Sequence, residues 1–163
     1  MKLALDTSYF MYGFDISPKS SIPKNVLDIF VENNEISELI FSDLVIFELN
    51  AKASKKLPEC IDLDNRTESL IKLEEETKFK KVSSQKNRIW ELACFLKSFH
   101  KDFVDCIHWA TAITQKADYF ISEDDVLKNL TDDKNFRGKF QNKFDYNLPK
   151  IMNFSSWLKY TKN

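Results

Sequence analysis

The chain has little glycine, little cysteine and no long apolar run, and each shortage excludes a class of function. With two glycines in 163 residues, a glycine-rich phosphate-binding loop is excluded. Three widely spaced cysteines without a Cys-x-x-Cys pair argue against a disulfide framework or a zinc knuckle and favour a reducing cytoplasm. No run approaches the roughly 18 apolar residues of a membrane span, and the N-terminal apolar run is too short for a signal peptide. We therefore expect a cytoplasmic protein without a membrane partner.

Neither charge sign dominates the chain. The formal net charge is -1, so any contact with a nucleic acid must come from a local basic patch rather than from the bulk charge. The length fits one globular domain over residues 1–163. The thirteen per cent of aromatic residues, fourteen of them Phe, indicates a well-filled core.

Short apolar runs alternate with segments of helical periodicity. We expect strands at 3–5, 36–41, 118–121 and 150–154. Helices are expected at 9–13, 24–33, 43–55, 89–99 and 102–115, followed by a last helix that contains Trp157 and is capped by Ser155. This alternation favours a three-layer α/β/α sandwich with a central parallel sheet.

Two segments are distinguished by their charge. Residues 59–76 are mainly acidic and residues 78–88 are basic, a pattern that most often marks a solvated helical surface. Residues 134–143 combine lysine and arginine with phenylalanine and are expected to form a basic, aromatic loop.

Four acidic residues lie where a parallel sheet binds its ligands. Asp6 and Asp124 follow predicted strands, and ligands bind beyond the carboxyl ends of such strands. Glu48 and Asp105 stand in otherwise apolar helical segments, where a carboxylate is unfavourable unless it is paired or bound to a cation. The pattern predicts a Mg²⁺ or Mn²⁺ site suited to phosphodiester hydrolysis.

Each acid also has a purely structural interpretation. Asp6 and Asp105 are placed to serve the N-termini of helices, and Asp124 suits a turn. Glu48 can pair with Lys52 one turn later on a surface stripe. The functional interpretation depends on the four acids together.

Four segments resemble the motifs of the PIN-domain family, in order and spacing from residue 3 to about 158. They are residues 5–9, 42–49, 105–112 and 117–124. The third has the form Asp-x-x-His-x-Ala-Thr-Ala, and the fourth has Ser122 where the family usually carries Thr. Residues 56–85 match no part of the family pattern.

The resemblance implies a PIN-like α/β/α fold and a Mg²⁺- or Mn²⁺-dependent endoribonuclease acting on single-stranded or structured RNA. It implies that metal binding and catalysis fall to Asp6, Glu48, Asp105 and Asp124, with Asp125 as a fifth acid. Many members are VapC-like toxins, often homodimers with an antitoxin protein as partner, and others process ribosomal RNA. The rival is a non-catalytic PIN-like module that binds RNA or protein, against which the intact set of four acids argues.

Three residues are expected to support the acids. Thr7 directly follows Asp6, and Ser122 lies two residues before Asp124. Ser122 has two interpretations: it orients water or a carboxylate, or it caps a helix. His108 is interpreted as a packing or supporting histidine rather than a general base. His100 has no sequence context that suggests a function.

The RNA contacts are expected from basic and aromatic residues near the acids. The candidates are Arg137, Lys139, Lys143, Lys52 and Tyr12, with residues 78–88 as an alternative surface. For residues 134–143 the other interpretation is a solvated loop whose phenylalanines anchor it to the core.

Overall fold

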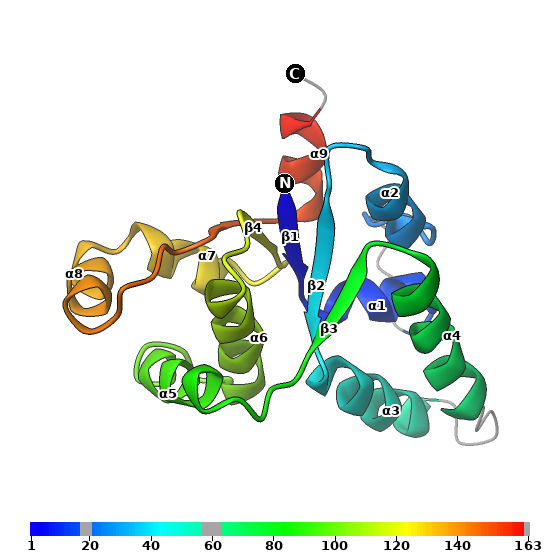
Figure 1. The fold of residues 1–163 in the computed structure, drawn as a ribbon, viewed down its shortest axis with the longest axis horizontal. Coiled ribbons are helices and arrows are strands. Elements are labelled where there is room, and N and C mark those ends of the chain that lie inside the picture. The colour runs from blue at the N-terminus through cyan, green and yellow to red at the C-terminus, as the bar shows by residue number, and fades with distance from the viewer. Residues whose placement is uncertain (17–20, 57–62, 162–163) are drawn as a thin grey trace.

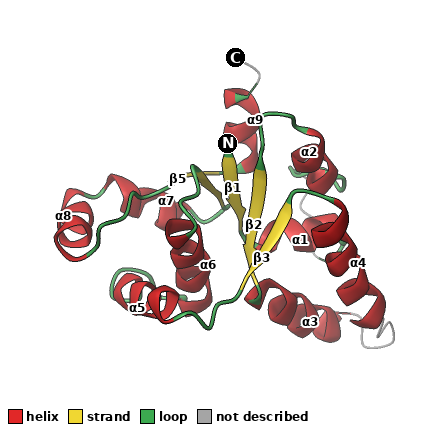
Figure 2. Cartoon of the chain, viewed as in Figure 1, coloured by secondary structure: helices red, strands yellow, loops and turns green. Residues whose placement is uncertain are grey.

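A parallel β-sheet forms the centre of the protein in the computed structural model, which describes residues 1–16, 21–56 and 63–161. In these residues the sheet has the strand order β3-β2-β1-β4-β5, and every pair is parallel. The strands are β1 Lys2–Leu5, β2 Glu38–Ser42, β3 Phe79–Val82, β4 Tyr119–Ile121 and β5 Lys150–Met152. The apolar side chains of β1 and β4 are buried because helices cover both faces of the sheet, as Figure 2 shows.

Two helical layers enclose this sheet (Figure 1). One layer comprises α1 Thr7–Gly13, α2 Val26–Glu32, α3 Leu44–Lys56, α4 Leu63–Glu76 and α9 Phe154–Tyr160. The other comprises α5 Asn87–Leu96, α6 Phe103–Thr114, α7 Asp125–Asp132 and α8 Lys134–Lys143. Each layer packs its own apolar cluster against the sheet, so the predicted three-layer α/β/α sandwich is confirmed.

The register between β1 and β4 positions the end of each strand. Leu5 pairs with Ile121, so the next residues, Asp6 and Ser122, emerge side by side at the carboxyl edge of the sheet. The backbone N–H of Asp6 also donates to the carbonyl of Ile121 at 3.1 Å. The strand pairing thus brings together two segments that are far apart in the sequence.

Residues 134–143 form helix α8, so the prediction of a loop was wrong. Asp133 caps the helix by accepting hydrogen bonds from the N–H groups of Asn135 and Phe136. Phe136 and Phe140, one turn apart, are fully buried, and Phe136 stacks on Trp109 of α6 with ring centroids 5.4 Å apart. Tertiary packing therefore decides the conformation of a segment whose polar composition favours a loop.

Two smaller expectations also differ from the structure. Residues 79–82 form the strand β3 rather than a helical surface, because Phe79 and Val82 are buried while the chain pairs with β2. The last helix is capped by Asn153, which accepts from the N–H of Ser156, rather than by Ser155. Of the helices in the described residues, none is both long and apolar enough to cross a membrane.

The docking of α8 can be tested through Phe136. Replacing Phe136 with Ala should lower the free energy of unfolding by about 3–5 kcal/mol, because it leaves a cavity against Trp109. Urea denaturation measures this change. Gln141→Ala, at an exposed position of the same helix, is the control and should change stability by no more than about 0.5 kcal/mol. Equal effects of the two substitutions would contradict the docking of α8 on α6.

Candidate metal centre

The predicted acids lie at the carboxyl edge of the sheet and on the helices beside it. Asp6 follows β1 and Asp124 follows β4, separated from it by Ser122 and Glu123. Asp105 lies in the first turn of α6, and Glu48 lies in the second turn of α3. Several different elements therefore contribute to one edge, as the sequence predicts for a sheet of this kind.

Ser122 links the carboxylate of Asp6 to the start of the segment that carries Asp124. Its Oγ donates to Oδ2 of Asp6 at 3.0 Å and accepts from the N–H of Asp124 at 3.1 Å. Ser8 donates to the same Asp6 oxygen at 3.1 Å. Asp6 occupies the N-cap position of α1 but its side chain makes no capping hydrogen bond, so capping does not account for this acid.

Glu48 is held by Thr7 and His108. The hydroxyl of Thr7 donates to Oε2 of Glu48 at 2.5 Å, and Nε2 of His108 lies 2.9 Å from the same oxygen. The side chain of Glu48 is only 17% exposed, so it is not part of a surface stripe, although Lys52 approaches Oε1 at 3.7 Å. His108 is buried and contacts Glu48, and its supporting role stays a prediction.

These partners keep Glu48 ionised. Burial by itself raises the pKa of Glu48, but the hydrogen bonds with His108 and Thr7, and the charges of His108 and Lys52, lower it further than burial raises it. The resulting pKa is below the ordinary value for glutamate. The carboxylate is therefore ready to accept a hydrogen bond or a cation at neutral pH.

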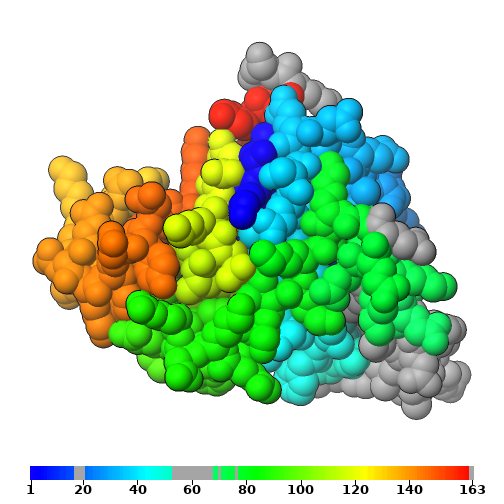
Figure 3. Space-filling view, in the orientation of Figure 1, coloured from blue at the N-terminus to red at the C-terminus, as the bar shows by residue number. Residues whose placement is uncertain are grey.

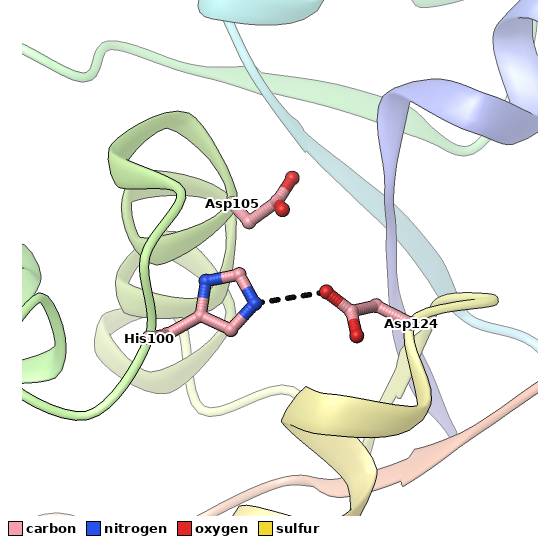
Figure 4. A group of neighbouring side chains, drawn as sticks. All are labelled: His100, Asp105 and Asp124. Atoms are coloured by element: carbon pink, nitrogen blue, oxygen red, sulfur yellow. Dashed lines mark hydrogen bonds and ion pairs between the residues drawn. The ribbon is translucent and has the colours of Figure 1, made fainter.

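His100, Asp105 and Asp124 form a compact group at the same edge (Figure 4). Each residue offers one ligand atom, and these atoms lie within 4.8 Å of one another. Nε2 of His100 is 2.9 Å from Oδ2 of Asp124, while Oδ1 of Asp124 accepts from the N–H of Val126 and caps α7. His100 is 4% exposed, and the structure places it beside two of the predicted acids although its sequence context suggests no function.

The sequence gives only a weak indication of His100. It lies between Phe99 and Lys101 after the end of α5, 24 residues before Asp124. Only the packing of the α5–α6 connection against the carboxyl edge of β4 brings the two side chains together. A weak local indication is its position two residues before Asp102, the residue that caps α6.

Asp105 carries charge that the protein alone does not neutralise. Burial, followed by repulsion from Asp6 and from Asp102, raises the pKa of Asp105 to about 7, and nearby His108 and His100 only partly offset this. Asp102, not Asp105, caps α6 by accepting from the N–H groups of Val104 and Asp105. A divalent cation fits this donor set, since hard cations prefer carboxylate oxygens and imidazole is a common nitrogen ligand.

An open cavity of about 580 Å³ gives access to the group. Its lining includes His100, Asp105 and Asp124 together with Phe99 and Lys101. Another cavity, of about 560 Å³, lies at the opposite edge of the sheet near Asp118, which precedes β4, and contains none of the four predicted acids. The first cavity is the one in which a ligand can meet the acids.

Of the four predicted acids, Asp6 and Glu48 lie outside the group of His100, Asp105 and Asp124, and so do Asp125 and Tyr12. Asp125 is exposed in the first turn of α7, whereas its neighbour Asp124 lines the cavity. Tyr12 is half-buried and makes an edge contact with the ring of Tyr9 at 5.9 Å. Their assignments as a fifth metal ligand and as an RNA-stacking residue stay predictions.

The basic residues of α8 differ in their relation to the cavity. The ammonium group of Lys139 lies 5.6 Å from the ring centre of Phe99, which lines the cavity, and that of Lys143 lies 5.5 Å from the ring of Phe95. Arg137 lines a separate cavity with Phe140. Figure 3 shows the surfaces of α8 (orange) and α5 (green) in direct contact. Lys139 is therefore the α8 cation best placed beside the acids.

Comparison with known proteins identifies one family. The sequence model of the PIN domain family matches residues 3–133, which is most of the chain. The matched segment includes all four predicted acids and His100. No curated protein matches the chain.

The charge state of Asp105 gives a test in the metal-free protein. Asp105→Asn should preserve the fold and raise the melting temperature at pH 8 by about 2–4 °C, the size that about 1 kcal/mol produces in a domain of this length. The pKa of Asp105 rises from an ordinary value of 3.8 to about 7 on folding, so the folded state binds the proton more tightly. The wild-type protein therefore loses stability as the pH rises from about 4 to about 7. The Asp105→Asn protein avoids this loss, because Asn cannot ionise.

Calorimetric melting between pH 4 and pH 8 measures the effect, which should be absent near pH 4. Asp125→Asn, at an exposed position, is the matched control and should leave the pH profile unchanged. An unfolded Asp105→Asn protein would mean that Asp105 is a structural residue of α6 and that the four acids are misinterpreted.

Proposed function

The chain belongs to the PIN domain family, and from this premise we propose that it is a divalent-metal-dependent endoribonuclease that cleaves single-stranded RNA. PIN domains in general are nucleases that bind divalent metals, which supports the class of reaction. The observation that carries the proposal is the meeting of Asp105 and Asp124 with His100, beside Asp6, at an open cavity.

In this proposal Asp6, Glu48, Asp105 and Asp124 hold Mg²⁺ or Mn²⁺. Such ions activate water and stabilise the charge that develops on phosphate oxygens. Asp105 and Asp124 line the cavity and bind on the side that the substrate reaches. The raised pKa of Asp105 means that ion binding releases a proton from this carboxyl near neutral pH.

The supporting side chains restrict the acids to one arrangement. Ser122 donates to Asp6 and accepts from the N–H of Asp124, so a single hydroxyl couples two acids. Thr7 and His108 orient Glu48 through the same carboxylate oxygen. Preorganised ligands lose little freedom when the ion binds, which favours both affinity and catalysis.

A non-catalytic module is the weaker alternative. Asp105 is half-buried with its charge opposed by that of Asp6, an arrangement that lowers the stability of the ion-free protein. Three finer roles stay predictions: a toxin with an antitoxin partner, a homodimer, and an enzyme of ribosomal RNA maturation. They depend on partners and RNA targets, and not on the residues at this edge of the sheet.

Cations beside the cavity support a polyanionic substrate. Lys101 lines the cavity, and Lys139 lies over the ring of Phe99. Lys52 lies near Glu48 on another side of the acids. These local positive charges offset the repulsion of phosphate by the acids in a protein whose net charge is -1.

Two neighbouring acids on α7 test the proposed activity. Asp124→Asn should reduce cleavage of a single-stranded RNA by more than about a hundredfold, beyond the 10–100-fold typical of groups that only support a metal ligand. Asp125→Asn should remain within about threefold of the wild type, because Asp125 is exposed and outside the group. The assay uses Mn²⁺ or Mg²⁺, and EDTA should abolish activity. Equal losses in the two variants, or cleavage that persists in EDTA, would contradict the proposal.

The RNA path can be tested through salt dependence. Lys139→Ala should flatten the slope of log affinity against log salt by about 0.7 for each phosphate contact that is lost. The measurement uses single-stranded RNA and the cleavage-deficient Asp124→Asn protein. Arg137→Ala is the comparison on the same helix and should have the smaller effect, because Arg137 lines a different cavity. A slope unchanged by Lys139→Ala would remove α8 from the RNA path.

A further inference from the structure

His100 offers an imidazole nitrogen as a ligand, whereas the four acids offer only carboxylate oxygens. We propose that Nε2 of His100 is a nitrogen ligand of the bound cation and that it makes the site select first-row transition-metal ions, such as Mn²⁺, over Mg²⁺. The inference rests on the proposed function in one respect, namely that Asp105 and Asp124 bind a divalent cation. It adds a ligand that the acidic motifs do not contain.

The spacing of the ligand atoms suits one ion. Two ligands at right angles around an ion, with bonds of about 2.1 Å, are about 3 Å apart. Nε2 of His100 and Oδ2 of Asp124 are separated by 2.9 Å, and the ligand atom of Asp105 lies within 4.8 Å of both. The three side chains point toward a common space in Figure 4, and all three line the open cavity.

The surroundings of the ring allow the tautomer that a ligand needs. Nδ1 of His100 lies 3.2 Å from the carbonyl oxygen of Asp102 and also 3.2 Å from its backbone N–H, which donates to Nδ1 when the ring proton is on Nε2. With its proton on Nδ1 the ring donates to that carbonyl, and the lone pair of Nε2 is directed at Asp124. Metal-binding histidines are usually held by such a hydrogen bond from the second ring nitrogen.

A cation can take the place of the proton between His100 and Asp124. With the ring proton on Nε2, His100 donates to Oδ2 of Asp124 at 2.9 Å; with the proton on Nδ1, the lone pairs of Nε2 and Oδ2 face each other and both are available to an ion. The ring cannot turn freely into water, since His100 is 4% exposed. Both atoms can act as ligands without a change in the fold.

The chemistry of the ligand atoms determines which ions bind more tightly when His100 is a ligand. Mg²⁺ prefers oxygen ligands and retains much of its water, whereas imidazole favours transition-metal ions. One nitrogen among carboxylate oxygens therefore raises affinity for ions such as Mn²⁺ more than affinity for Mg²⁺. His108 is less suited, because its Nε2 contacts both Thr7 and Glu48.

Calorimetric titration with Mn²⁺ and with Mg²⁺ tests the selectivity. His100→Gln should weaken Mn²⁺ binding on the order of tenfold or more, the range seen when a group at a metal site is lost. The binding of Mg²⁺ should change much less, so the ratio of the two affinities falls. Lys101→Gln, next in the chain and on the same cavity, is the matched control, because loss of its charge should change both affinities in the same direction.

Electron spin echo measurements on bound Mn²⁺ test the ligand directly, because they detect a coordinated imidazole nitrogen. The chain has two histidines, so the wild-type signal should come from His100 and disappear in His100→Gln. The wild-type spectrum is informative even if the variant fails to fold.

The outcomes separate this inference from the proposed function. Bound Mn²⁺ without nitrogen coupling, or a coupling that persists in His100→Gln, would overturn the nitrogen ligand and leave the acidic metal site intact. An equal loss of affinity for Mg²⁺ and Mn²⁺ in His100→Gln would overturn the selectivity. Failure of the wild type to bind either ion would instead contradict the proposed function.

Discussion

The concentration of negative charge at the carboxyl edge of the parallel sheet is the constraint on which the rest of the site depends. Asp105 is buried beside Asp6, and the resulting repulsion raises its pKa to about 7. Such an arrangement lowers the stability of the ion-free fold and persists only where the surrounding structure supports it. Hydroxyls, histidines and helix termini around the acids provide that support.

The supporting interactions divide the edge into two linked parts. Ser122 connects Asp6 to the segment of Asp124, and the pairing of Leu5 with Ile121 makes this contact possible. On the other side, Thr7 and His108 share one oxygen of Glu48. Asp105 interacts electrostatically with Asp6 of the first part and with His108 of the second, so a change in the start of α6 would affect both parts.

An aromatic cluster connects α8 to the same edge. Phe95 contacts Phe99, Phe136 and Phe140 at ring distances between 5.3 and 6.3 Å, and Phe99 borders the cavity that holds His100. Packing in this layer therefore places the α5–α6 connection, and with it His100, while the ammonium group of Lys139 lies over the ring of Phe99. The cluster serves both the stability of the layer and the position of groups at the site.

The sequence alone was sufficient for the parallel sandwich and for the positions of Asp6 and Asp124, because apolar strands and the acids that follow them are local patterns. It also indicated that His108 is a buried, packed histidine. Tertiary structure decided the conformation of α8 and β3, where burial of Phe136 and Phe79 outweighs polar composition. It also decided the place of His100, since a contact across 24 residues depends on how two layers pack and leaves no periodic trace in the chain.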